Sequence, residues 1–71
     1  MTQTRVFNAT TGELQAQGTT LECAEQIIAA LGESEAFSSE LDNGLTIEQA
    51  REAMASAPDS WLTVNGWEIR R

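Results

Sequence analysis

The C-terminal residues 60–71 constrain the fold most, because they place one Asn-Gly pair between two runs of alternating apolar residues. A two-residue Asn-Gly loop favours a type I′ turn, in which both central residues have positive φ and the twist matches that of the strands. Asn65-Gly66 therefore predicts a closing β-hairpin. The loop also sets its register, with Val64 opposite Trp67.

This register divides the predicted hairpin into two faces. The inner face carries four apolar side chains: Leu62, Val64, Trp67 and Ile69. Trp61 and Arg70 lie opposite each other on the outer face. Either this face is shielded, by a cross-strand cation–π pair or by the N-terminal segment, or the two residues form an exposed contact for a partner.

A first helix is predicted from Thr19, or from the residue after it, to about Leu31. Thr19 lies three residues before Glu22, the spacing of a capping box, and Gly32 follows the helix as a stop. Apolar residues recur at helical spacing: Leu21, Ala24, Ile27, Ile28 and Leu31. Cys23 lies beside this stripe and is expected to be a buried or half-buried apolar residue.

Residues 33–44 fit two structures. Phe37 and Leu41 are spaced as on a helical turn, but they also alternate with polar residues as in a short strand. We favour one or two helical turns. In either structure both apolar side chains point inward.

A second clear helix is predicted from Thr46 to Pro58. Thr46 and Gln49 repeat the capping-box spacing, and proline ends the helix. Its apolar stripe is narrow: Ile47, Ala50, Met54 and Ala57. The small alanines allow close packing against a neighbouring element.

A first hairpin is predicted over residues 5–16, with Gly12 in its loop and Phe7 opposite Leu14 on the core side. The order is β-hairpin, helix, short helix, helix, β-hairpin. It predicts one α+β domain over residues 1–71, with an antiparallel or mixed sheet and helices packed on one face. The terminal strands are expected to be neighbours.

Charge is the strongest feature of the composition. Eleven acidic residues oppose four arginines, there is no lysine, and the formal net charge is −7. No basic residue occurs between Val6 and Ala50. Such a chain is poorly suited to bind a phosphate backbone or an anionic membrane, so we expect neither direct nucleic-acid nor membrane binding. The acids either keep a small protein soluble or address a basic partner.

The chain offers little for catalysis. Without histidine or lysine, a serine or cysteine nucleophile lacks its usual base. A calcium loop centred on Gly44 fails, because Ser39 and Ala50 would occupy its first and last ligand positions. We therefore expect no catalytic residue, cofactor or metal. The single cysteine excludes an internal disulfide and, with no targeting segment at the N-terminus, favours the cytoplasm.

The predicted function is a non-enzymatic protein-interaction domain that inhibits a basic, nucleic-acid-binding protein. The candidate partner-binding residues are acidic or belong to the outer face of the C-terminal hairpin: Glu33, Glu35, Glu40, Asp42, Glu48, Glu52, Trp61 and Arg70. The alternative is a small assembly domain that forms a homodimer through its sheet edge. A winged-helix DNA-binding function is disfavoured because the would-be recognition helix is net negative.

In composition, the chain resembles small, acidic, lysine-poor accessory proteins of phages and mobile elements. Some proteins of that kind inhibit host nucleases. The likeness covers no motif, so it supports only the expectation of an interaction protein.

Overall fold

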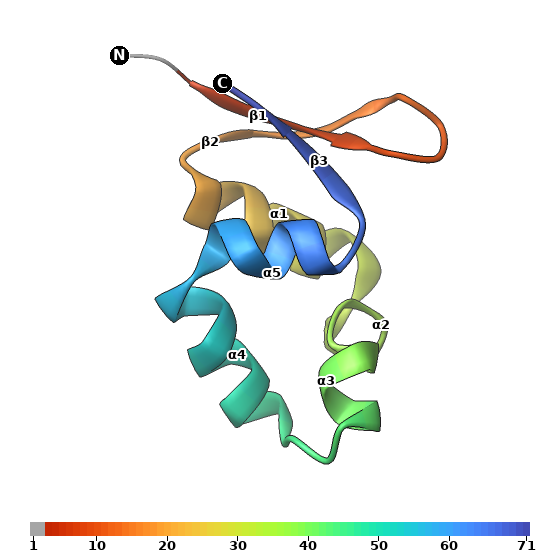
Figure 1. The fold of residues 1–71 in the computed structure, drawn as a ribbon, viewed down its shortest axis with the longest axis vertical. Helices are drawn as coiled ribbons and strands as arrows, with labels where there is room; N and C mark the ends of the chain where they lie inside the picture. Colours follow the sequence, from red (N-terminus) through yellow and green to blue (C-terminus); the bar gives the residue numbers. More distant parts are fainter. Residues whose placement is uncertain (1–2) are drawn as a thin grey trace.

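A three-stranded antiparallel sheet forms one end of the molecule, and helices cover one of its faces (Figure 1). The computed structural model describes residues 3–71. The strands are β1 (Thr4–Asn8), β2 (Leu14–Gly18) and β3 (Trp67–Arg70), in the spatial order β2-β1-β3. The predicted α+β class is therefore confirmed. The terminal strands β1 and β3 pair antiparallel, as expected.

The helices form two layers beneath the sheet. In chain order they are α1 (Thr20–Leu31), α2 (Glu33–Ala36), α3 (Ser38–Asp42), α4 (Ile47–Ser56) and α5 (Pro58–Val64). Helices α1 and α5 pack against the sheet and each other, whereas α3 and α4 lie at the far end of the long axis (Figure 1). No helix in the described part of the chain is long and apolar enough to cross a membrane.

Both predicted capping boxes are present. At the start of α1, the Thr19 hydroxyl accepts a hydrogen bond from the Glu22 backbone N–H (3.1 Å), and the Glu22 carboxylate accepts one from the Thr19 N–H (2.9 Å). Hydrogen bonding of the Glu22 carboxylate to the Thr19 backbone N–H, and then to the Thr19 hydroxyl, lowers the pKa of Glu22 below its usual value, because it favours the ionised carboxylate. Thr46 and Gln49 repeat the arrangement before α4. Residues 33–44 contain two short helices, α2 and α3, so the favoured helical structure is confirmed.

The predicted C-terminal hairpin is wrong, because residues 58–64 form helix α5 and only the second predicted strand exists, as β3. Pro58 stands in the first turn of α5, where its fixed φ suits a helix and its missing N–H is not needed. Pro58 therefore starts a helix as well as following one. Strand β3 pairs with β1 instead of folding back on residues 60–64.

The Asn-Gly pair ends the helix instead of turning a hairpin. Asn65 has φ −88° and ψ 10°, far from the positive φ of a type I′ turn, and only Gly66 has a positive φ, of 83°. The Asn65 side chain donates a hydrogen bond to the Trp61 carbonyl (2.8 Å), and the Gly66 N–H donates one to the Thr63 carbonyl (3.1 Å). These bonds satisfy carbonyls at the end of α5, the same task that a C-terminal glycine performs in other helices.

The first hairpin forms, but its faces are reversed relative to the prediction. Phe7 pairs with Leu14 as expected, yet a register shift after Val6 places Val6 opposite Ala16. Val6 and Ala16 are buried, whereas Leu14 is 47% exposed on the face away from the helices. The bulge brings Ala16 opposite Val6, and sequence alternation alone does not reveal it. Which face of the hairpin is buried depends on the side on which α1 packs against β1 and β2.

The core lies between the sheet, α1, α4 and α5. Its fully buried large side chains are Val6, Cys23, Ile27, Phe37, Met54 and Leu62. Trp67 and Ile69 are partly buried against this core, in line with the prediction. Val64 is not: it was expected inside but is 77% exposed. The predicted helix stripes also lose their outer members, because Leu21, Leu31 and Ala57 are exposed.

Cys23 gives a direct test of the packing of α1 on the sheet. Its side chain is fully buried, its thiol lies 3.8 Å from the Thr4 carbonyl, and burial followed by the charge of Glu22 raises the thiol pKa above its usual value. We expect iodoacetamide to alkylate the native protein at least about a hundredfold more slowly than the denatured protein, since only opened molecules react. Mass spectrometry of timed samples measures both rates. A native rate close to the denatured one would show that α1 and β1 do not pack as described.

The raised thiol pKa also has a consequence for stability. Above the usual thiol pKa the unfolded chain releases a proton that the native chain retains. The free energy of unfolding therefore falls as the pH rises through that range.

Candidate functional site

An ion cluster connects α4 to α1 and α2. The Arg51 Nε donates to Glu33 Oε2 at 2.6 Å, and its Nη1 lies 3.6 Å from Glu25 Oε1. The hydrogen bond to Glu33 raises the pKa of Arg51 above its usual value, because it favours the charged guanidinium. Glu33, a candidate partner-binding residue, is therefore largely occupied within the protein.

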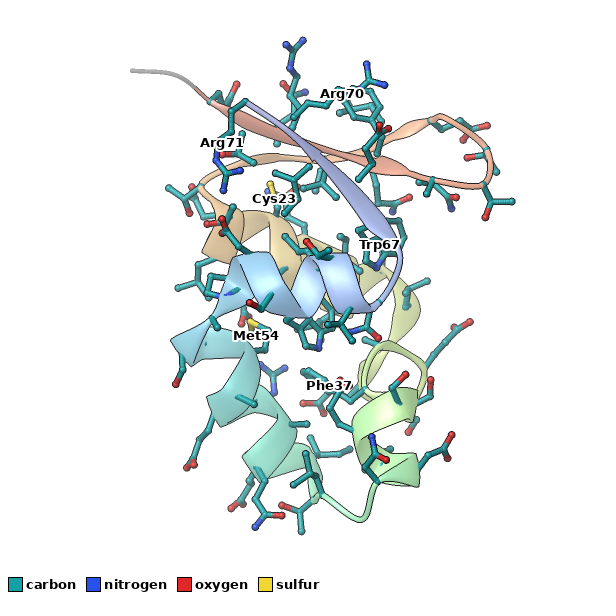
Figure 2. All side chains as sticks on the ribbon, in the orientation of Figure 1. Cys23, Phe37, Met54, Trp67, Arg70 and Arg71 are labelled. Carbon is teal, nitrogen blue, oxygen red and sulfur yellow. The ribbon has the colours of Figure 1, made fainter. Side chains whose placement is uncertain are left out.

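Trp61 lies at the centre of the helical layers and not on an outer surface. Its indole Nε1–H donates to Glu40 Oε1 at 2.9 Å, and its ring meets the Phe37 ring edge-on at a centroid separation of 5.7 Å. Arg51 lies over the same Phe37 ring, 5.9 Å from its centroid. Figure 2 shows Phe37 between α4 and the α2–α3 segment. Trp61, Phe37 and Glu40 thus join α5 to α3, and the alternative of an exposed Trp61 that contacts a partner is wrong.

Arg70 lies at the opposite end of the molecule from the predicted acidic residues (Figure 2). Its guanidinium lies over the Phe7 ring, 4.9 Å from the centroid, and 3.3 Å from a Glu68 carboxylate oxygen. The predicted pairing of Arg70 with Trp61 is therefore wrong. Arg70 covers the outer face of the sheet instead, where Arg5 is its cross-strand neighbour.

The acidic residues gather on the segment of residues 33–56, which we call the helical lobe. Six carboxylates and one arginine occur there, and six minus one leaves −5 of the net −7. Four of the six have no ion-pair or hydrogen-bond partner among the described residues: Glu35, Asp42, Glu48 and Glu52. The sheet end carries three arginines (Arg5, Arg70 and Arg71) and one glutamate in its strands and C-terminal residue. The molecule is thus strongly polarised along its long axis.

Two shallow hollows adjoin at the end of α5. The first encloses about 210 Å³ between α4 and α5, and its walls include Ala53, Ala57, Trp61 and Val64. The second encloses about 420 Å³ between the α1–α3 segments and the start of β3. Val64 and Asn65 border both hollows. We call this surface, centred on the exposed Val64 side chain, the Val64 face.

Sequence reasoning missed the Val64 face because it placed Val64 in a strand. The signal that could have revealed α5 was the order Pro58-Asp59-Ser60, since proline and an acidic residue are favoured in the first turn of a helix. On a helix, Ser60 and Val64 are four residues apart and share one side. The exposed position of Val64 then follows once Leu62 is buried.

The described residues 3–71 contain no group of three histidine, cysteine, aspartate or glutamate side chains that could hold a metal ion. Comparison of the chain with protein-family models, with curated protein sequences and with solved structures finds no match. Proposals about function therefore depend on the charge distribution and surface of the molecule itself.

Proposed function

We propose that the protein is a non-enzymatic interaction domain whose helical lobe binds a basic protein, of the kind whose own ligand is a nucleic acid. The observation that carries the proposal is the excess of carboxylates on the lobe, where the single arginine is already held by Glu33 and Glu25. A surface of one sign attracts a partner of the opposite sign over a range set by ionic strength. Such a lobe would compete with phosphates for the basic groove of its partner.

The charges at both ends of the molecule support binding of the basic partner at the helical lobe and not at the sheet end. Glu35, Asp42, Glu48 and Glu52 are exposed, so their charges are available without rearrangement. The strands that carry Arg5 and Arg70 lie at the far end of the long axis (Figure 1), so these arginines would not oppose a basic partner at the lobe.

The test compares two variants with the same change in net charge. Glu35→Gln with Asp42→Asn removes two lobe charges, and Glu13→Gln with Glu68→Gln removes two charges at the sheet end, neither of which contacts the lobe. Basic DNA-binding proteins retained by the wild-type protein at low salt are quantified by mass spectrometry, and duplex DNA is then added as competitor. We expect the lobe variant to weaken retention by about tenfold and the control variant to weaken it much less.

Retention that falls equally in both variants would mean that net charge alone drives the association. Retention that DNA does not reduce would mean that the lobe does not occupy a nucleic-acid site. Either outcome contradicts the proposal.

A second candidate function is homodimer formation through β3, which is an edge strand. Antiparallel pairing of two copies with Ile69 opposite Ile69 would place each Glu68 opposite the Arg70 of the second copy. Opposite charges at such cross-strand positions are favourable. Sedimentation equilibrium at high micromolar concentration tests this function, and a strict monomer would contradict it.

A further inference from the structure

Val64 stands out among the exposed apolar side chains. It is 77% exposed, whereas the other large exposed hydrophobic residues lie between 36% and 47%. A single exposed apolar residue needs no special explanation. Val64, however, borders two hollows. The one between α4 and α5 is mainly apolar and includes Ala53 and Ala57, whereas the other combines Leu31 and Trp67 with polar residues.

The hollow between α4 and α5 results from small residues on facing helices. Ala53 lies on α4 and Ala57 directly follows the end of that helix, whereas Ser60 and Val64 are four residues apart along α5 and share one side of it. The short side chains of the alanines and Ser60 leave space between the two segments beside Trp61. The hollow can therefore receive a side chain from outside without displacing one of its own.

The charges around the Val64 face are negative. Glu40 borders the first hollow and Glu35 borders the second, and no arginine borders either one. Arg51 and Arg71 are held by carboxylates of the protein, Glu33 and Asp59 respectively. An incoming apolar group thus meets a surface whose nearby charges are all of one sign.

The negative charge around the Val64 face favours some binding partners over others. A second copy docked symmetrically through the same face would bring Glu35 and Glu40 close to the same carboxylates of the other molecule, which is unfavourable. An anionic lipid surface would be repelled in the same way. A segment that presents an apolar side chain between lysines or arginines can fill the hollow with the apolar group and pair its basic groups with the carboxylates.

We propose that the Val64 face docks a basic amphipathic helix of the partner protein. This inference rests on the proposed function and specifies the part of the partner that is recognised. The apolar stripe of the helix covers Val64 and enters the hollow between α4 and α5, and its basic residues pair with Glu35 and Glu40. Recognition of an amphipathic helix by an apolar groove is a common mode of peptide binding.

The test uses a synthetic Leu–Lys peptide of about 16 residues, long enough to form a helix on binding, with leucines at i, i+3, i+4 and i+7. A second peptide has the same composition with its leucines spread around the helix. Binding is followed by NMR from the Val64 methyl groups and the Trp61 and Trp67 indole N–H groups. We expect the amphipathic peptide to bind at least about tenfold more tightly than the scrambled one and to shift the Val64 methyl signals.

The matched variants are Val64→Ser and Leu14→Ser, which each remove an exposed apolar side chain, from the Val64 face and from the outer sheet face respectively. Val64→Ser is expected to weaken binding of the amphipathic peptide by about tenfold, and Leu14→Ser to leave it unchanged. Near-UV circular dichroism verifies that both variants fold.

Each contrary result has a separate meaning. If both peptides bind equally and Val64→Ser has no effect, the docking site is overturned while the charge-based function stands. If neither peptide binds at low salt, the proposed function fails as well. If the protein alone dimerises and Val64→Ser prevents it, the occupant is a second copy and the proposal is overturned.

Discussion

Replacing Trp61 by alanine is expected to lower the free energy of unfolding by about 3–5 kcal/mol. The indole is 93% buried, since only 7% of the residue is exposed, and its loss removes contacts with Phe37 together with the hydrogen bond to Glu40. Whole domains of this size are stabilised by only about 4–10 kcal/mol. Urea unfolding monitored by circular dichroism should therefore show a barely folded or unfolded variant.

Two further substitutions separate the causes of this loss. Trp61→Phe keeps an aromatic ring but leaves Glu40 without the indole donor, and about 1 kcal/mol of the loss is expected from that bond. Trp67→Ala is the matched control, because Trp67 is only partly buried against the core. Trp67→Ala is expected to lower the free energy of unfolding by less, about 1–3 kcal/mol. A Trp67 variant as unstable as the Trp61 variant would contradict the placement of α5.

Replacing Phe37 by alanine is expected to lower the free energy of unfolding by about 3–5 kcal/mol, because its side chain is fully buried and contacts Trp61 of α5. Phe7→Ala offers a matched control on the outer face of the sheet, where the ring is half-buried under Arg70. For Phe7→Ala, the free energy of unfolding should fall by less, about 1–2 kcal/mol. Thermal and urea unfolding of both variants make the comparison.

The Phe37–Trp61 contact itself is measurable with a double-mutant cycle. The edge-on ring geometry predicts a coupling energy of about 0.5–1.5 kcal/mol beyond the loss of buried area. Additive single-variant losses would mean that the two rings do not contact each other in solution. Because this contact joins α5 to the lobe, such a result would also weaken the case for the Val64 face.

The helix starts were the most predictable part of the fold. Thr19 with Glu22 and Thr46 with Gln49 satisfy backbone groups within four residues of chain, so the interaction is complete within the local sequence. Gly32 likewise ends α1 at the predicted position. Helix-capping sequences of this kind depend little on the tertiary structure around them.

The candidate partner-binding residues were predictable in part. The sequence shows that acidic residues crowd the middle of the chain, and the structure gathers six of them on the helical lobe. Which carboxylates remain available could not be predicted, because Arg51 reaches Glu33 over 18 positions of chain and Trp61 reaches Glu40 over 21. Contacts over such separations leave no periodic trace in a sequence.

The C-terminal residues show most clearly where local information ends. Asn-Gly can turn a hairpin or end a helix, since both use the positive φ that glycine tolerates. By itself the sequence determined that the chain breaks direction at Gly66 and that an apolar strand follows. Only the tertiary structure decided that residues 58–64 are helical. In a strand, the Trp61 and Leu62 side chains would point to opposite faces, whereas in helix α5 both are buried in the core and Trp61 contacts Phe37. Strand β3 then pairs with the edge of β1 instead of with residues 60–64.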